Sequence, residues 1–397
     1  MSGSFADLGV SPFFVKRLGD RNILKPTEIQ RLVIPRLLAG GKILFRAATG
    51  TGKTFAYLIP FLQRILEDPA SNGAGGPAFL IAAPTYELCA QIKEEADFLL
   101  KSAAGPGGAE AGPKVSLLIG SANLGRQIEA LKRERPLVAA GNPGRLQLLA
   151  RMGKLKARNI RFLVLDEWDR LISPEILEET ASLVSFLGRG PAAPLWAACS
   201  ATLQGKNREQ LLALMGEGCE TVETEEQEIL RERIGHWAIF SERRGKIDTL
   251  RSFLSAAKPR KALVFSGGGG QPGIILSRLR YARIPSAGLW GSMDRKTRKD
   301  AIDGFRSGRY PVLVSSDLAA RGLDVPGITH VIALDVPADG EAYIHRAGRT
   351  GRAGQRGLMV SIGDGEEMRR LAGLEKKLGL VVHPKELYGG RIRQAGD

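Results

Sequence analysis

Short apolar runs alternate with amphipathic stretches along most of the 397-residue chain. Continuous runs of three to six apolar residues are typical of strands buried on both faces, and apolar positions that recur every three or four residues are typical of helices. In the first half, the predicted strands are Ile43–Phe45, Phe79–Ala82, Val115–Ile119, Leu137–Ala140, Phe162–Leu165 and Leu195–Cys199. The predicted helices there are Glu87–Leu100 and Asn207–Leu214. This alternation predicts an α/β fold, a mostly parallel sheet flanked by helices.

A second series of the same kind follows the acidic stretch Glu223–Glu228, which lacks apolar periodicity and therefore predicts the start of a linker. The strands predicted in this series are Ala262–Phe265, Val312–Val314, Val331–Leu334 and Leu358–Ile362, and the helices are Ile274–Tyr281, Lys296–Phe305 and Ala342–Arg349. We therefore predict two domains, 1–222 and 233–378, joined by a linker at 223–232. A short tail at 379–397 follows, because the pattern weakens there.

The net charge of the chain indicates what class of partner it binds. The chain has 57 Lys and Arg against 42 Asp and Glu, a net charge of +15, which favours a polyanion such as nucleic acid. Charge alone leaves open an ordinary enzyme that happens to be basic. No run of about eighteen apolar residues exists, so we expect no membrane span. The cysteines Cys89, Cys199 and Cys219 have no metal-like spacing and indicate reduced thiols of a cytoplasmic protein.

A glycine-rich turn lies between the strand Ile43–Phe45 and a helix-like run that begins at Phe55. The turn and the start of the helix are Ala48, Thr49, Gly50, Thr51, Gly52, Lys53 and Thr54. Backbone N–H groups of such a turn cradle phosphate oxygens, while Lys53 supplies a charge and Thr54 a hydroxyl for Mg²⁺. The turn therefore predicts a nucleoside triphosphate site.

An acidic cluster, Asp166-Glu167-Trp168-Asp169, ends the strand Phe162–Leu165. Open α/β sheets bind their ligands at the carboxyl ends of their strands, so these carboxylates are placed to meet the triphosphate. Thr54 of the turn is the candidate Mg²⁺ ligand. The turn and the cluster together predict a nucleotide triphosphatase.

Further short motifs lie before and after these two, in a fixed order along the chain. Lys25–Gln30 reads KPTEIQ, Ser200–Thr202 reads SAT, and His345–Arg352 reads HRAGRTGR. With these motifs the chain resembles the DEAD-box family of ATP-dependent RNA helicases, from Phe5 to about residue 378. The resemblance implies two tandem RecA-like domains, with ATP and Mg²⁺ as cofactors and RNA as partner. It also implies that Mg²⁺ is held by Thr54 and, through water, by Asp166.

The resemblance assigns adenine recognition to the segment around Gln30. A carboxamide can both donate to and accept from the adenine edge, which selects ATP. Lys25 belongs to the same motif, and Phe5, twenty-five residues before Gln30, matches the aromatic residue that stacks on adenine. Gly322 and Asp324 are expected near the ribose and the phosphates.

A second set of residues is expected to hold the RNA backbone through main-chain N–H groups, hydroxyls and Arg side chains. These residues are Pro84, Thr85, Gly120, Asn142, Gly144, Arg145, Arg298 and Ser316. Losing one Arg contact should weaken RNA affinity modestly and reduce its salt dependence. Because backbone contacts carry little sequence information, we expect sequence-nonspecific binding.

The resemblance also implies the catalytic residues, which are Lys53, Asp166, Glu167, Asp169, Ser200, Thr202, Arg349 and Arg352. Glu167 would orient or deprotonate the attacking water, and Ser200 and Thr202 would couple hydrolysis to RNA binding through Asp169. Lys53 with Arg349 and Arg352, the expected arginine fingers, would neutralise charge on the phosphates. Closure of the two domains should unwind a short RNA duplex locally.

Trp168 departs from the family, which carries Ala at this position. One interpretation is that the indole points away from the nucleotide into an adapted pocket. The sharper hypothesis is that it alters contact with Ser200–Thr202 and uncouples hydrolysis from RNA binding. Further departures are Tyr86, Asn142, Arg295 and Ser316.

Two functional classes follow from these residues. The first is an active ATP-dependent RNA helicase or RNA–protein remodelling enzyme. The second is an ATP-gated RNA-binding clamp or scaffold with weak or uncoupled ATPase, while a DNA helicase is a distant third. We expect a monomer that is targeted, if at all, by its surface loops or by a protein partner.

Overall fold

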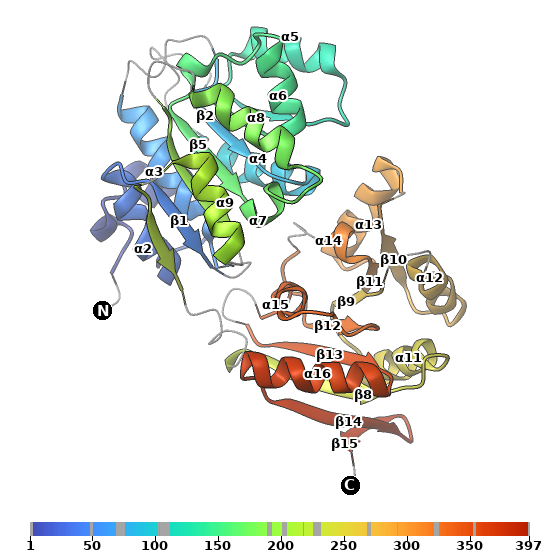
Figure 1. The fold of residues 1–397 in the computed structure, drawn as a ribbon. Coiled ribbons are helices and arrows are strands. Elements are labelled where there is room, and N and C mark those ends of the chain that lie inside the picture. The colour runs from blue at the N-terminus through green and yellow to red at the C-terminus, as the bar shows by residue number, and fades with distance from the viewer. Residues whose placement is uncertain are drawn as a thin grey trace. The chain divides into compact units, whose positions relative to one another are not determined.

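The computed structural model describes residues 3–47, 51–68, 76–101, 103, 112–188, 193–200, 205–216, 218–224, 232–267, 271–291, 293–320, 325–351 and 355–395. The chain divides into two compact units, Met1–Thr224 and Glu225–Asp397. Each unit has its own sheet with helices on both faces (Figure 1). This arrangement confirms the predicted fold class.

The first unit is built on a seven-stranded sheet in which every pairing is parallel. In spatial order its strands are β3 (Val115–Leu118), β4 (Val138–Gly141), β2 (Phe79–Ala82), β5 (Phe162–Asp166), β6 (Leu195–Ser200), β1 (Ile43–Arg46) and β7 (Glu220–Glu223). Its helices are η1 (Ala6–Leu8), α1 (Pro12–Gly19), α2 (Glu28–Leu38), α3 (Lys53–Glu67), α4 (Tyr86–Leu100), α5 (Leu124–Glu134), α6 (Pro143–Arg151), η4 (Ala157–Asn159), α7 (Trp168–Leu171), α8 (Leu177–Gly188) and α9 (Gly205–Met215).

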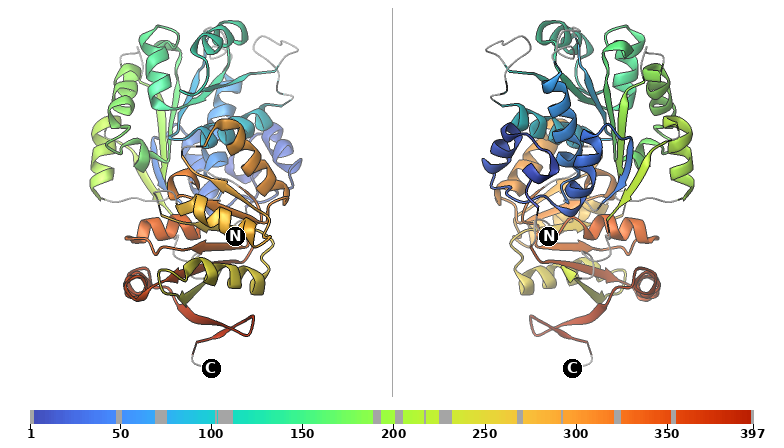
Figure 2. Two further views of the ribbon diagram at one scale, coloured as in Figure 1. Left: turned by 90° about the vertical axis from the view of Figure 1, so that its right-hand side faces the viewer. Right: turned by 90° about the vertical axis from the view of Figure 1, so that its left-hand side faces the viewer.

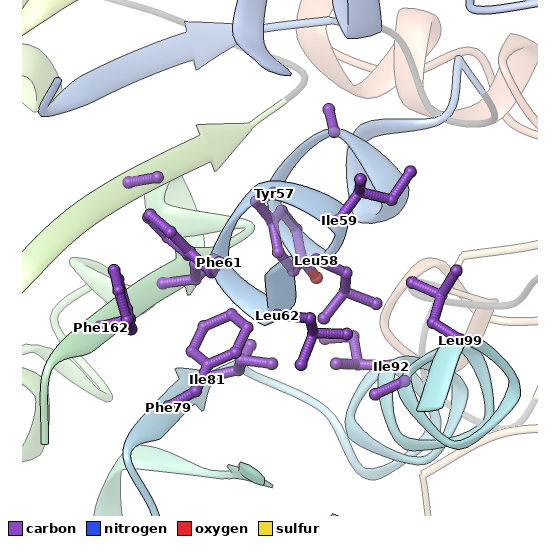
Figure 3. Close-up of a cluster of buried hydrophobic side chains, with 14 of the residues drawn as sticks. Tyr57, Leu58, Ile59, Phe61, Leu62, Phe79, Ile81, Ile92, Leu99 and Phe162 are labelled. Carbon is purple, nitrogen blue, oxygen red and sulfur yellow. The ribbon is translucent and has the colours of Figure 1, made fainter. Parts of the chain in front are cut away.

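Alternate residues of each central strand enter two different cores, because successive side chains of a strand point to opposite faces. On one face, Phe79 and Phe162 pack against Phe61 of α3, with ring centroids 5.3 and 4.7 Å from that of Phe61 (Figure 3). On the other face, Leu163 and Leu165 pack among residues of α6, α7 and α8. The sheet is therefore buried on both sides, as the apolar runs predicted.

The second unit carries an eight-stranded sheet. In spatial order its strands are β10 (Ser286–Leu289), β11 (Val312–Ser315), β9 (Ala262–Phe265), β12 (His330–Ala333), β13 (Gly357–Gly363), β8 (Ile234–Phe240), β14 (Val382–Tyr388) and β15 (Arg391–Gln394). Its helices are α11 (Lys246–Ala257), α12 (Gln271–Tyr281), α13 (Arg295–Ser307), α14 (Asp317–Ala320), α15 (Gly340–Ala347) and α16 (Gly365–Leu378). Only β14 and β15 pair antiparallel among these strands of the described chain.

The segment at 379–397 is not the short tail that we predicted. β14 pairs parallel with β8 and turns back into β15, so the hairpin forms the outer edge of the second sheet (Figure 2). The beginning of the predicted linker at 223–232 is also part of a sheet. Glu223 ends β7, and its carboxylate pairs with Arg46 of β1 at 3.0 Å. Residues 225–231 of that linker lie outside the described residues.

Candidate nucleotide and RNA site

The predicted site residues of the first unit gather along one edge of its sheet, the edge where the parallel strands end (the carboxyl edge). The pairing registers bring these strand ends level, since Leu118, Gly141 and Ala82 are neighbours on β3, β4 and β2. Asp166 of β5 is likewise paired with Cys199 of β6. We call the edge formed by β5, β6 and β1 the β1 half, and the edge formed by β3, β4 and β2 the β3 half.

In the β1 half, the glycine-rich turn is held by two side chains. The Lys53 ammonium donates to the carbonyl of Ala47 at 2.6 Å. The Gln30 amide donates to the carbonyl of Gly52 at 3.1 Å, and its oxygen accepts from the Thr27 N–H as part of a capping box. Gly52 has φ +90°, and a Cβ there would lie 2.4 Å from the Gln30 amide nitrogen, so only glycine fits.

Gln30 therefore connects the start of α2 to the phosphate turn. Its side chain is 2% exposed and uses one of two amide hydrogens and one of its oxygen's two lone pairs in these contacts. The remaining donor and acceptor match the predicted role toward adenine, which stays a prediction.

Among the described residues of the expected site, Asp166 is the most buried carboxylate, at 3% exposure. Its Oδ2 accepts from the Tyr57 hydroxyl at 2.8 Å, and its Oδ1 accepts from the Glu167 N–H at 2.9 Å and from the Cys199 thiol at 3.1 Å. Burial raises the pKa of Asp166, while the charge of Lys53 acts in the opposite direction. The carboxylate is thus surrounded by donors but removed from water.

Tyr57 and Cys199 both stay protonated beside this carboxylate. Burial is the main cause that raises the pKa of each, and the negative charge of Asp166 adds to it. Because neither group ionises in the neutral range, each remains a hydrogen-bond donor to Asp166.

Glu167 and Asp169 follow Asp166 closely in the chain, and Ser200 ends the neighbouring strand β6. Glu167 has a left-handed backbone, φ 52°, which is uncommon for a residue other than glycine and is often found at functional sites. Its carboxylate lies 3.4 Å from the Arg170 guanidinium. Asp169 is half-buried in α7, and Ser200 ends β6 with no exposed surface.

Trp168 is fully buried on the opposite face of the sheet from α3 and Tyr57. The indole shares its core with Leu165, Trp196 and Ala198. Its Nε1, like that of Trp196, has no hydrogen-bond partner within the described chain. The structure therefore supports the interpretation that this side chain points away from the nucleotide.

Two further residues are expected at adenine. Phe5 is 2% exposed and belongs to the same core as Phe14 and Ile29, and its stacking on adenine stays a prediction. Lys25 is exposed at the end of the loop before α2.

In the β3 half, side chains hold the main chain in place. The hydroxyl of Thr85 caps α4 by accepting from the Leu88 N–H at 3.3 Å, and Pro84 before it is half-buried. The Asn142 amide donates to the carbonyl of Ala83 at 3.1 Å, which ties the end of β4 to the end of β2. This contact explains how Asn can stand at this position.

Arg145 is buried, at 9% exposure, and binds the protein itself. Its guanidinium donates to the carbonyls of Gly120 and Ala122, at 2.8 to 3.1 Å, and to the Gln127 side chain at 2.7 Å. The prediction of a direct phosphate contact is therefore corrected: Arg145 is a positioning residue for the exposed Gly120 turn. Gly144, in the first turn of α6, is half-buried.

In the second unit, Arg298 and Ser316 follow the carboxyl ends of the neighbouring strands β10 and β11. Arg298 donates to the carbonyl of Trp290 at 3.3 Å, and the N–H of Ser316 donates to the carbonyl of Leu289 at 3.2 Å. Arg349 is 3% exposed, and its Nε donates to the carbonyl of His345 at 3.3 Å. Its finger role stays a prediction.

Several predicted site residues cannot be placed. Ala48, Thr49, Gly50, Thr202, Gly322, Asp324 and Arg352 lie outside the described residues. Thr51 and Thr54 are described and half-buried, next to Lys53 at the start of α3.

Comparison with known proteins decides the family. The model of the DEAD/DEAH box helicase family matches residues 27–211, and that of the helicase conserved C-terminal domain matches residues 245–354. The DEAD-box ATP-dependent RNA helicase CshC of Bacillus cereus is 32% identical over 383 residues, 96% of this chain and 93% of that protein. The chain belongs to the DEAD-box family of ATP-dependent RNA helicases.

Other relatives agree with this family. The probable ATP-dependent RNA helicase YfmL of Bacillus subtilis is 31% identical over 374 residues, 93% of each chain. S. cerevisiae Dbp5 bound to RNA and ADP BeF3 has the same fold, with a TM-score of 0.84 and 24% identity over 97% of this chain and 96% of that one. DEAD-box proteins of this family are ATP-hydrolysing RNA helicases, and the clamp alternative is not favoured.

The structure adds residues to this DEAD-box core that sequence reasoning missed. Tyr57 and Cys199 bind Asp166, and the one available signal was that Tyr57 lies four residues after Lys53 on the same helix face. Arg346, buried within HRAGRTGR, binds the carboxylates of Asp317 and Asp335 at 2.5 and 2.9 Å. It thereby ties the start of α14 to the loop after β12.

Proposed function

We propose that this DEAD-box helicase binds Mg²⁺-ATP at the β1 half and the backbone of an RNA strand at the β3 half of the same edge. One observation carries the proposal. The strands of both halves belong to one parallel sheet, and their carboxyl ends are paired in register, so all of them end at the same edge. Because both ligands then contact loops of one rigid sheet, a change at the γ-phosphate can alter RNA contacts a few strands away.

The residues of the β1 half fit a divalent cation with its triphosphate. Asp166 is a buried carboxylate with a raised pKa, so a cation beside it would favour its ionised form, and Thr54 begins the helix that follows the phosphate turn. Mg²⁺, when bound, would neutralise charge on the phosphate oxygens. Asp166 and Thr54 are the residues that would hold it.

The remaining steps belong to side chains of the chain. Lys53 would exchange the Ala47 carbonyl for phosphate oxygens, since an ammonium binds either acceptor and the phosphate carries the larger charge. Glu167 would orient or deprotonate the attacking water. Arg349 and Arg352 of the second unit would be needed for full turnover, and Ser200 and Thr202 would transmit the state of Asp169.

The decisive experiment measures phosphate release and duplex unwinding with and without RNA. RNA should raise kcat for ATP hydrolysis by at least about tenfold, and unwinding should require hydrolysable ATP. RNA retention with ATP but little phosphate release would contradict the proposal. Unwinding rates that differ little between unrelated duplexes of equal stability would support sequence-nonspecific recognition.

Compartment and assembly are also proposals. The cysteines Cys89, Cys199 and Cys219 are free, and no helix within the described residues is long and apolar enough to cross a membrane. The free thiols support a reducing compartment such as the cytoplasm, which fractionation would test. We retain the monomer, which light scattering would test, and targeting by a protein partner, which co-purification would test.

A further inference from the structure

The positive charge of the protein is concentrated in one part of the second unit. Residues 225–397 contain 30 Lys and Arg against 20 Asp and Glu, a net charge of +10 out of +15 for the chain. Within them, residues 258–309 contain twelve basic residues and only three acidic ones. Nearly all of the excess in this unit therefore comes from a segment of 52 residues.

At least six of the twelve basic residues in this segment lie away from the expected RNA elements, because they are near the ends where the parallel strands begin. Ser286, Val312 and Ala262 are level neighbours where β10, β11 and β9 begin. The segments that precede these strands therefore meet at one edge, the amino edge, with α12 and α13 beside it (Figure 1). Arg298 and Ser316 follow the opposite ends, about 13 Å away along strands of four residues.

Six exposed side chains of these segments form what we call the amino-edge patch. They are Lys258, Arg260, Arg278, Tyr281, Arg283 and Arg306. The carbonyl of Arg306 accepts from the buried Lys261 ammonium at 2.8 Å, which joins the end of α13 to the start of β9. Burial lowers the pKa of Lys261, and the nearby charges of Arg260 and Arg306 lower it further, so the positive charges lie close together.

The described acidic side chains near the patch mostly have basic or capping partners of their own; Asp248, which lines a pocket with Ala282 and Ile284, pairs with Arg251 at 2.8 Å. Of the three acidic residues in the segment, Asp294 caps α13 and Asp300 binds Arg309 at 2.6 Å, which leaves Asp303. The patch therefore favours an anion that is extended along the edge.

Two residues of the patch occupy positions that stability would assign to glycine. Lys258 ends α11 with φ 44°, and Arg283 follows α12 with φ 58°, both in the left-handed region. Glycine or asparagine is the least strained choice after a helix, because a larger side chain crowds the backbone there. Both side chains are therefore held at this edge at a cost in backbone strain, and, like Arg135 after α5 in the first unit, they also lie favourably at the negative end of a helix dipole.

Tyr281 adds a surface for stacking among these charges. It is 89% exposed at the end of α12, two residues before Arg283 and three after Arg278. An aromatic ring between arginines is the combination that binds single-stranded nucleic acid, since bases stack on the ring while the cations hold phosphates. A paired duplex would hide the bases that this ring can stack on.

We propose that the amino-edge patch is a second binding surface for single-stranded RNA, separate from the RNA elements at the carboxyl edges. The proposal rests on the proposed function, because it assumes that an RNA strand is bound at those edges. A strand held there can reach the patch only if it is long enough to pass around the second unit. Binding at both surfaces then strengthens retention of long strands and not of short ones.

The test compares single strands of about 10 and about 40 nucleotides, labelled with a fluorophore, in the presence of Mg²⁺ and a non-hydrolysable ATP analogue. The variant carries Arg260→Gln, Arg278→Gln and Arg283→Gln. Its Kd for the long strand should rise about tenfold, and the slope of log Kd against log salt should fall by about 2, while the short strand is unaffected. Tyr281→Ala should weaken long-strand binding with an unchanged slope.

The matched control removes the same charge from α16, through Arg369→Gln, Lys376→Gln and Lys377→Gln, all exposed in the same unit. It should change the long-strand Kd by less than about twofold, because these residues alternate with Glu366, Glu367 and Glu375. Equal losses in both triple variants would overturn the patch and indicate net charge alone.

A second variant separates binding from folding. Lys258→Gly with Arg283→Gly should raise Tm, because it relieves left-handed backbone, and should still weaken long-strand binding. Unchanged long-strand affinity would overturn the proposal. In a parallel measurement with phosphatidylserine vesicles, variants that lose vesicle binding but keep their RNA affinity would also overturn it, because the patch would then bind a lipid surface. Failure of the unaltered protein to bind either strand, or to be stimulated by RNA, would instead contradict the proposed function.

Discussion

The two halves of the carboxyl edge in the first unit are built differently, although they belong to one sheet. The β1 half places a buried carboxylate, Asp166, among the donors Tyr57 and Cys199. The β3 half uses Asn142 and Arg145 to hold carbonyl groups of the main chain. Chemistry on a phosphate needs groups removed from water, whereas contact with a sugar-phosphate backbone needs exposed main chain of a fixed shape.

The largest difference between the two halves is expected when the β1 half alone is disabled. Lys53→Ala removes the charge expected at the phosphates and should lower kcat for RNA-stimulated ATP hydrolysis by about 10³-fold. RNA affinity without nucleotide should stay within about twofold, because the β3 half is untouched. Phosphate release and RNA anisotropy measure the two. Lys101→Ala, at an exposed position after α4, is the control, and a parallel loss of RNA affinity would contradict independent halves.

Trp168 tests whether packing beneath the edge contributes to coupling. Trp168→Ala should destabilise the protein by about 3 kcal/mol or more, because the indole is fully buried. The control Trp196→Ala removes a second buried indole of the same core, whose Nε1 also has no partner in the described chain. At a temperature where both variants are folded, RNA-stimulated turnover should fall more in Trp168→Ala, because this indole, although it points away from the nucleotide, anchors the backbone between Glu167 and Asp169 in the core. Unchanged turnover and unwinding would reject a role in coupling.

A substitution of Arg145 tests whether the β3 half binds RNA through positioned main chain or through a direct contact of this side chain with phosphate. Arg145→Gln removes the four contacts to carbonyl and amide oxygens and should weaken RNA binding by about tenfold, through loss of the Gly120 turn. Since the guanidinium is not expected on phosphate, the salt dependence of RNA binding should stay the same. A slope reduced by about 0.7 or more would show a direct phosphate contact instead. Arg151→Gln, exposed on the same helix, is the matched control.

The strands that consist of continuous apolar runs could be predicted from the sequence. Phe79–Ala82 and Ala262–Phe265 are strands with the predicted bounds. β8 was missed because Gly235 and His236 interrupt its apolar run, although His236 is buried and bonded to the Tyr343 hydroxyl at 2.8 Å. The hairpin β14–β15 was missed because its side chains are largely polar and only half-buried at most. A polar residue satisfied by tertiary contact leaves no periodic signal.

In the candidate site, too, contacts between distant segments could not be predicted from the sequence. Motif spacing identified Asp166 and Arg145, because short motifs mark the ends of strands. It could not tell that Arg145 turns inward or that Phe5 is buried, since both depend on packing between segments distant in the chain. Nor could it pair Cys199 with Asp166, because that contact requires the register between β5 and β6.

The smallest expected effect concerns a single hydroxyl of the β1 half. Tyr57→Phe removes a donor that favours the ionised form of Asp166, so the pKa of that carboxyl should rise further above its usual range. If activity needs ionised Asp166, activity is lost as pH falls through this pKa, and the acid limb of the pH–rate profile should move to higher pH. Near neutral pH, kcat should fall only a few-fold, by about the value of one hydrogen bond.

The control for this change is Tyr343→Phe, which removes a buried hydroxyl bonded to His236 in the second unit, outside the predicted site. Both variants lose one buried hydrogen bond, so their Tm values should fall by similar amounts. Only Tyr57→Phe should shift the acid limb, because only its hydroxyl contacts a carboxylate expected to act in hydrolysis. An equal shift in both would mean that the profile reports stability. No shift in either would mean that Asp166 is held ionised by its cationic neighbours, with Tyr57 serving only to position it.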